Sequence, residues 1–164
     1  MLFLRAIFFT LLMPGSALVL IPWLLLRGQP SPHVETIDVP AIIGSILVIA
    51  GTGTLLYCIR DFAVSGRGTL APLDPPRKLV RVGLYRHVRN PMYVGVVLAL
   101  VGEAIYLESE VLGFYAAIAA LSFHLFVVLF EEPSLRALFG ADYEKYRASV
   151  PRWIPRLRPW KGTL

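Results

Sequence analysis

The sequence predicts an all-α protein: a polytopic membrane helix bundle of about four transmembrane helices, with length for a fifth. Of its 164 residues, 56% are hydrophobic, and the mean hydropathy is +0.65. These residues fall in long runs rather than in alternation, which is typical of helices in lipid. Crossing a bilayer core takes about 20 helical residues. Four such runs use most of the chain, so we expect one integral membrane domain over residues 1–164.

The apolar runs are interrupted by few charges, such as Arg5 near the start of the first. No clear small-residue cleavage site follows that run, so we expect a retained helix and not a signal peptide. The single cysteine, Cys58, lies in the second run, which excludes an intramolecular disulfide and predicts no metal site built from thiolates. The expected spans are 2–26, 41–61, 91–107 and 111–130, with a cytoplasmic loop at 64–90 and a cytoplasmic tail at 131–164.

Basic side chains are concentrated in the loop and the tail. Cytoplasmic connections retain Lys and Arg, and four spans place both regions on one side, so we expect both termini and the functional face in the cytoplasm. Anionic headgroups explain the net charge of +5, and we expect no nucleic-acid partner. These residues are Arg67, Arg77, Lys78, Arg81, Arg86 and Arg89 in the loop, and Arg136, Lys145, Arg147, Arg152, Arg156, Arg158 and Lys161 in the tail.

Small residues recur in the second and third runs. Such residues allow two helix backbones to approach closely, so they predict tight packing between spans. They are Gly44, Ala50, Gly51 and Gly53 in the second run, and Gly95, Ala99 and Gly102 in the third.

The loop 64–90 leads directly into the third run through Asn90 and Pro91. Asparagine before proline is typical of a helix N-cap with proline at the first helical position. The N–H groups of a helix start favour a carboxylate or phosphate, and long loops at the mouth of a bundle are commonly functional. A capped helix beside a lipid-facing basic loop would explain the same residues without a ligand.

Two adjacent carboxylates, Glu131 and Glu132, follow the fourth run. Neighbouring helix positions point about 100° apart. We therefore expect Glu131 to face the bundle and a ligand, and Glu132 to pair with basic residues of the loop, although such a pair can also simply mark the end of a span. Residues 133–148 predict an interfacial amphipathic helix broken at Gly140. Residues 150–156 are expected to fold back over the site.

These features together resemble the integral-membrane methyltransferases, which include isoprenylcysteine carboxyl methyltransferases and phospholipid N-methyltransferases. The resemblance covers about residues 66–155 and is carried by residues 79–95 and 131–146, then by Val150, Pro151 and Pro155. It implies methyl transfer from S-adenosyl-L-methionine to a lipophilic acceptor, with the cofactor under the loop and tail. The residues that match cofactor-binding positions are Arg77, Lys78, Leu79, Val80, Tyr85, Asn90, Pro91, Met92, Tyr93 and Glu131.

The acceptor stays open between an isoprenylcysteine-like carboxylate and a phospholipid-like amine. Asn90 stands where the prenylcysteine enzymes have histidine, and Val127 where they have an arginine for the substrate carboxylate. An amine must first lose a proton. The candidates for a base are His124, Glu103 and Glu132, and the sequence singles out none of them.

Two other functions also stay open. One is an NADPH-dependent membrane reductase acting on a sterol or polyprenoid, against which the paired glutamates and the Asn-Pro-Met-Tyr sequence argue. The other is a non-catalytic membrane subunit, which would need neither the covering loop nor the carboxylates. The predicted partners are membrane lipids and a lipophilic or lipid-modified substrate, and the oligomeric state is not defined.

Overall fold

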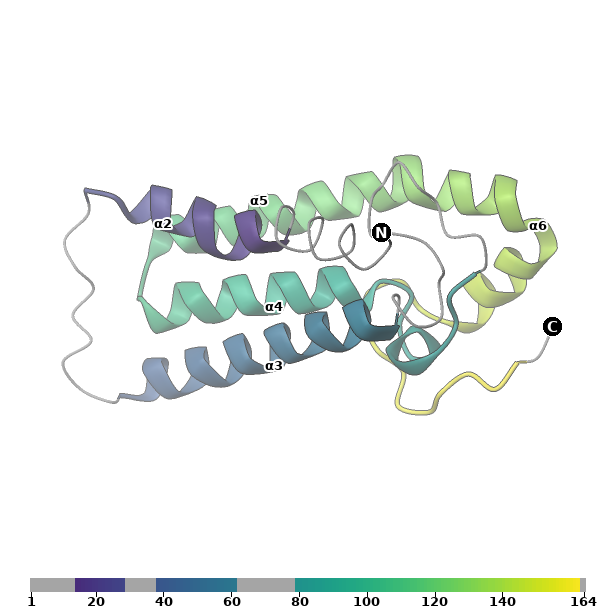
Figure 1. The fold of residues 1–164 in the computed structure, drawn as a ribbon, viewed down its shortest axis with the longest axis horizontal. Coiled ribbons are helices and arrows are strands. Elements are labelled where there is room, and N and C mark those ends of the chain that lie inside the picture. The colour runs from purple at the N-terminus through teal and green to yellow at the C-terminus, as the bar shows by residue number, and fades with distance from the viewer. Residues whose placement is uncertain (1–13, 29–37, 62–78, 163–164) are drawn as a thin grey trace.

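The computed structural model describes residues 14–28, 38–61 and 79–162, and every regular element in these ranges is helical. The predicted all-α class is confirmed for this part of the chain. Figure 1 shows the long helices side by side, with the C-terminal segment gathered at one end. In order, the elements are η1 (Ser16–Leu20), α2 (Ile21–Leu26), α3 (Val39–Asp61), η3 (Gly83–Arg86), α4 (Pro91–Tyr106), α5 (Glu110–Phe126), η4 (Val127–Glu131) and α6 (Glu132–Ser149).

Among the residues that the structure describes, two helices are long and apolar enough to cross a membrane: Val39–Asp61 and the continuous helix Glu110–Ser149. Only 22% of the most apolar window of each is buried within the molecule, whereas the core helix of a soluble protein is mostly buried. Large side chains such as Ile49 and Phe114, each 72% exposed, cover their outer faces. This surface suits lipid, and the protein is a membrane protein. The helical stretches Ser16–Leu26 and Pro91–Tyr106 are apolar but shorter.

Helices α3 and α4 pack backbone against backbone. A Cβ atom on Gly51 would lie 2.5 Å from the Gly95 carbonyl oxygen and 2.5 Å from the Ala99 nitrogen. One on Gly44 would lie 2.7 Å from the Gly102 oxygen, closer than real Cβ contacts allow. The predicted small-residue contact is therefore confirmed at these positions. Gly53 and Ala50 take no part in it, because Gly53 faces open space and Ala50 is exposed on another face of α3.

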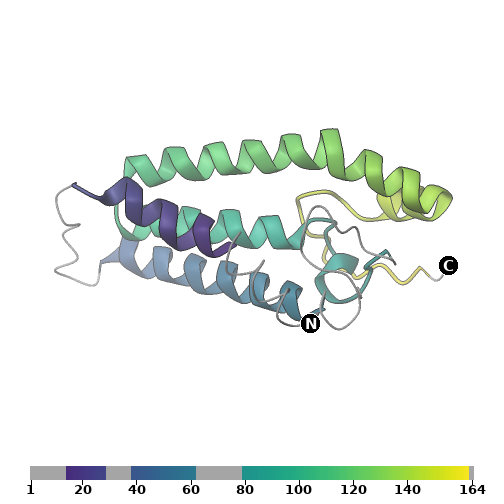
Figure 2. The same ribbon diagram turned by 45° about the horizontal axis from the view of Figure 1, so that its top comes forward.

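Helix α5 continues through the π-helix η4 into α6, so the predicted fourth span and the start of the predicted tail form one helical path. A π-turn contains an additional residue, which shifts the faces presented before and after it. The predicted break at Gly140 is confirmed, because its φ of 48° and ψ of −123° are not helical. Figure 2 shows α6 turning back at this end of the molecule.

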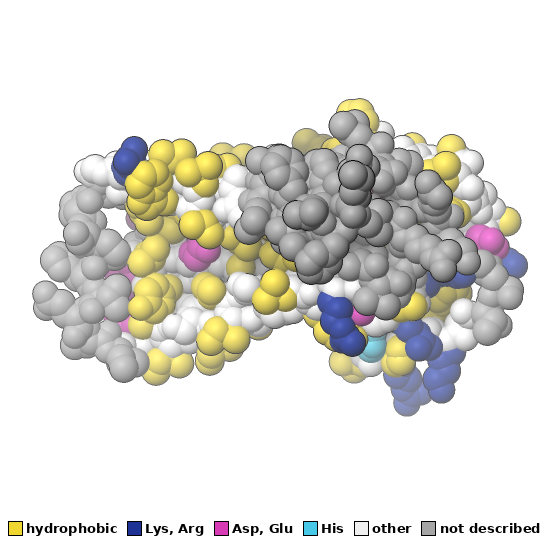
Figure 3. Space-filling model, in the orientation of Figure 1, with side chains coloured by type: hydrophobic (Ala, Val, Ile, Leu, Met, Phe, Trp, Pro, Cys, Tyr) yellow, Lys and Arg dark blue, Asp and Glu magenta, His cyan; other side chains and the backbone are white. Residues whose placement is uncertain are grey.

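Beyond α6, the chain folds back across the segment that precedes α4, as expected. The backbone N–H of Arg89 donates to the Pro151 oxygen at 2.9 Å, and that of Trp160 donates to the Arg86 oxygen at 2.9 Å. The Tyr146 hydroxyl donates to the Tyr85 carbonyl at 2.6 Å. We call residues 79–90 and 141–162 the polar layer. Figure 3 shows Lys and Arg gathered at this end, and hydrophobic side chains over the helices.

Candidate functional site

The first turn of α4 meets the end of η4 through Tyr93 and Glu131. The Tyr93 hydroxyl donates a hydrogen bond to Glu131 Oε2 at 3.1 Å. The Tyr93 ring stacks on Phe123 of α5, with ring centroids 4.9 Å apart. Both Tyr93 and Glu131 are half-buried. Glu131 thus faces the bundle, which is the direction that its position on the helix predicted.

Asn90 occupies the N-cap position of α4, and Pro91 follows at the first helical position, as the sequence predicts. The side chain of Asn90, however, makes no capping bond to the start of the helix. Its Nδ2 group instead donates to the Arg152 carbonyl at 3.2 Å. The folded-back tail passes directly against the buried Asn90, so the Arg152 carbonyl accepts the hydrogen bond from this amide.

Glu132 is buried, at 4% exposure, among basic side chains of the polar layer. Its Oε1 atom accepts from Arg89 Nη1 at 2.9 Å and from Arg152 Nε at 2.6 Å, and its Oε2 accepts from Arg152 Nη2 at 3.1 Å. Arg89 also donates to the Tyr143 hydroxyl at 3.1 Å. The predicted pairing of Glu132 with a basic loop residue is confirmed. We call these four residues the Glu132 cluster.

The charges in the Glu132 cluster decide its ionisation. Burial alone would raise the pKa of Glu132, but the hydrogen bonds from Arg152 and the charge of Arg89 hold this pKa below its usual value. The pKa of Arg152 is raised in turn, chiefly by its hydrogen bonds to Glu132. The cluster therefore joins the start of α6 to the loop before α4 and to the tail through ion pairs. A carboxylate held in this way is a poor proton acceptor.

The other predicted cofactor residues lie at the same end of the bundle, mostly in packing contacts. Val80 and Tyr85 are buried beside Cys58 of α3, and Met92 packs against them. Leu79 packs against the cluster of Tyr143, Tyr146 and Val150. Pro91 is fully buried. Arg77 and Lys78 lie outside the described residues.

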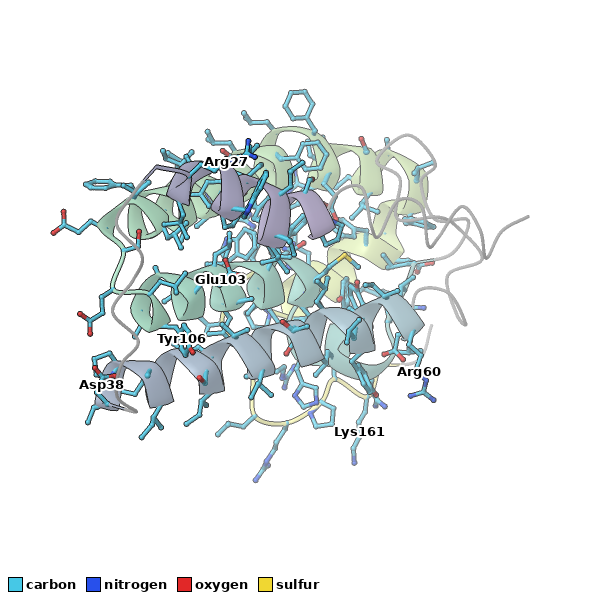
Figure 4. All side chains as sticks on the ribbon, turned by 60° about the vertical axis from the view of Figure 1, so that its left-hand side comes forward. Arg27, Asp38, Arg60, Glu103, Tyr106 and Lys161 are labelled. Carbon is cyan, nitrogen blue, oxygen red and sulfur yellow. The ribbon has the colours of Figure 1, made fainter. Side chains whose placement is uncertain are left out.

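The three candidate bases are not gathered together. His124, exposed on α5, accepts a hydrogen bond at Nδ1 from Trp153 Nε1 at 3.1 Å. Glu132 belongs to the cluster described above. Glu103 lies ten residues after Tyr93 on α4, about 15 Å further along the helix. Figure 4 shows Glu103 near Tyr106, at the end of the molecule opposite Lys161.

Sequence reasoning predicted a basic loop partner for Glu132 without singling out Arg89, and it predicted neither of the tail contacts. In the tail, Arg152 also holds Glu132, and Trp153 contacts His124. One signal in the sequence could have indicated these partners. A carboxylate at the end of an apolar run needs a hydrogen-bonding or positively charged partner once the tail covers it. Among the described residues, no group of His, Cys, Asp and Glu could hold a metal ion.

Residues 39–142 match the family described as phospholipid methyltransferase. A methanethiol S-methyltransferase 2 of Bradyrhizobium diazoefficiens is 29% identical over 159 residues, covering 90% of this chain and 59% of that protein. The protein-S-isoprenylcysteine O-methyltransferase of Schizosaccharomyces pombe is 35% identical over 77 residues, 47% of this chain and 33% of its own. The B enzyme of the same name from Arabidopsis thaliana is 31% identical over 78 residues, 48% of this chain and 40% of its own. The chain thus spans less than two thirds of each relative, and no solved structure matches it.

Proposed function

The chain belongs to the phospholipid methyltransferase family, and from that premise we propose that it is an S-adenosyl-L-methionine-dependent methyltransferase acting on a lipophilic acceptor. The hydrogen bond between Tyr93 and Glu131 carries the proposal. It joins the two segments on which the family resemblance rests, and these segments are far apart in the sequence. We further propose a multi-pass topology with both termini and the polar layer in the cytoplasm, which the shared position of the basic segments 79–90 and 150–162 supports.

The residues at this contact fit the proposed cofactor. A carboxylate such as Glu131 accepts hydrogen bonds from an ammonium group or from ribose hydroxyls. The ring faces of Tyr93 and Phe123 attract a cation such as a sulfonium. When bound, S-adenosyl-L-methionine supplies a methyl group on a positively charged sulfur. The further contacts proposed from the family are Arg77, Lys78, Leu79, Val80, Tyr85, Asn90, Pro91 and Met92.

The chain's own contribution is positioning and exclusion of water. The Glu132 cluster fixes the tail against the start of α4, next to the contact between Tyr93 and Glu131. A covered site of this kind orients its reactants and removes competing water. The exposed apolar faces of α3 and α5 allow a lipophilic acceptor to approach from the bilayer.

The contacts and positions of the three candidate bases favour an acceptor that is already nucleophilic and needs no deprotonation. Glu132 is held charged between two arginines, and Nδ1 of His124 is occupied by Trp153. Glu103 lies far along α4. An acceptor such as a thiolate or carboxylate needs no base, whereas a protonated amine does. Buried Val127 provides no charge for a carboxylate, so a thiolate fits these residues best.

Calorimetric titration of the purified chain with S-adenosyl-L-methionine and with NADPH tests the proposal. We expect saturable binding of S-adenosyl-L-methionine only, and Glu131→Ala should abolish it without unfolding the protein. Glu144→Ala is the matched control, because Glu144 is an exposed carboxylate of α6 paired with Arg136 and Arg147. The absence of binding by the native chain would refute the cofactor. Equal binding by Glu131→Ala would remove the proposed role of this residue.

The acceptor class can be ranked with cofactor labelled in its methyl group. The purified chain is incubated with a lipophilic alkanethiol, a prenylated cysteine or phosphatidylethanolamine, and the labelled product is counted. We expect the thiol to be methylated fastest. Preferential labelling of phosphatidylethanolamine would show that a proton acceptor has been overlooked.

A further inference from the structure

The tail exposes apolar and basic side chains together on the outside of the polar layer. Ile154 is 79% exposed and Leu157 is 98% exposed, and Arg158 and Lys161 are exposed beside them. We propose that Ile154, Leu157, Arg158 and Lys161 form an interfacial anchor that binds anionic phospholipid headgroups of the bilayer that holds the protein. This tail anchor does not depend on the proposed methyl transfer.

The backbone around the tail anchor is fixed by hydrogen bonds. The Arg156 N–H donates to the His87 carbonyl at 3.0 Å, and the Trp160 N–H donates to the Arg86 carbonyl at 2.9 Å. The Arg86 side chain returns a bond from Nε to the Trp160 oxygen at 2.6 Å. Leu157 and Arg158 lie between these two attachments. Their exposure is therefore a property of a held segment and not of a frayed end.

Both kinds of side chain suit the bilayer interface. Apolar side chains between arginines and lysines insert below the headgroups while the charges remain among the phosphates. The ion pairs of the described residues include neither Arg158 nor Lys161. By contrast, the exposed Arg136 and Arg147 of α6 both pair with Glu144. The tail anchor thus has positive charge that the described part of the chain leaves uncompensated.

The position of the tail anchor matches the end of a membrane-spanning helix. Arg60 lies in the last turn of α3, where that candidate span ends. Figure 4 shows Lys161 at the same end of the molecule as Arg60. Figure 3 shows basic side chains gathered there. Headgroups at this level would meet the tail, and each basic residue near an anionic surface changes the ratio of bound to free tail roughly fivefold.

A spin label at the tail tests the proposal on the full chain. Pro159→Cys introduces a thiol between the two basic residues, and the native Cys58 is fully buried. The nitroxide-labelled protein is placed in nanodiscs of phosphatidylcholine, with or without phosphatidylglycerol. Accessibility to oxygen and to a water-soluble nickel complex then reports the immersion of the label. We expect greater immersion with phosphatidylglycerol.

Two pairs of substitutions, each removing two charges, separate the tail anchor from a general charge effect. Arg158→Gln with Lys161→Gln should lower the ratio of bound to free tail about 25-fold in anionic nanodiscs. Arg136→Gln with Arg147→Gln should leave it unchanged. Equal immersion in both lipid mixtures, or equal loss in both variants, would overturn the proposal. Dipolar broadening between labels would also overturn it, by identifying a second copy of the chain as the occupant.

Discussion

The contact between α3 and α4 and the polar layer at the end of the bundle are held together by opposite means. Between the helices, Gly51 and Gly95 bring two backbones so close together that no side chain fits between them. At the polar layer, Arg89 and Arg152 bind Glu132 of α6, and the tail is attached by backbone and side-chain hydrogen bonds. Lipid offers no hydrophobic force between helices, so close packing holds them. In the polar layer, directional bonds between buried polar groups take this role instead.

This difference implies different sensitivities. The contact between the backbones of α3 and α4 should be lost when a larger side chain is introduced, at any pH. The Glu132 cluster should be lost when one of its charges is removed, even by a side chain of similar size. Substitutions and titration can therefore disturb one region while leaving the other in place.

The largest effect is expected for Gly51→Leu. The side chain would start 2.5 Å from the backbone of α4, and backbone cannot move aside as a flexible side chain can. The cost should exceed the roughly 1–3 kcal/mol typical of overpacking, so no folded protein should be recovered. Gel filtration and thermal unfolding in detergent check this. Gly53→Ala on the same helix is the control and should unfold at an equal or higher temperature, because Gly53 faces open space and alanine stabilises a helix interior relative to glycine.

A smaller and more local effect is expected for Glu132→Ala. This change leaves the Arg89 side chain, only 9% exposed, without its carboxylate. Breaking a buried pair costs about 3 kcal/mol. Chemical unfolding followed by tryptophan emission should show early loss of the polar layer, while helix content measured by circular dichroism persists. Glu144→Ala should cost less than about 1 kcal/mol, and an equal loss in the two variants would contradict the importance of the buried cluster.

The smallest effect is expected from acid. Because the pKa of Glu132 is lowered in the folded protein, the unfolded chain takes up this proton first as the pH falls. The stabilisation is complete above the usual glutamate pKa of about 4.3 and is lost as the pH falls through the lowered value. Thermal unfolding monitored by tryptophan emission across this range should show the loss, and Glu132→Gln should flatten it. An unchanged profile in Glu132→Gln would assign the acid sensitivity to another group.

Local chemistry made much of this arrangement predictable. Small residues at helical spacing predicted the contact of Gly51 with α4, and Gly140 predicted the turn in α6. The 100° between neighbouring helix positions predicted different directions for Glu131 and Glu132. Each of these inferences needed only residues close in the sequence.

The missed features join distant segments. The Asn90 amide binds the Arg152 carbonyl instead of the helix start, and His124 contacts Trp153. Neither contact has a periodic signature, since the tail is irregular and its path is set by which donors remain available after folding. The π-helix Val127–Glu131 also escaped prediction, because its composition is that of an ordinary apolar helix.

That π-helix fixes the length of the chain between α5 and α6. Loss or gain of one residue there would rotate everything that follows by about 100° relative to α4. Glu131 would turn away from Tyr93, and Glu132 would leave its arginines. The number of residues in Val127–Glu131 therefore matters apart from their side chains, because a change in length would break both contacts even if Glu131 and Glu132 were kept.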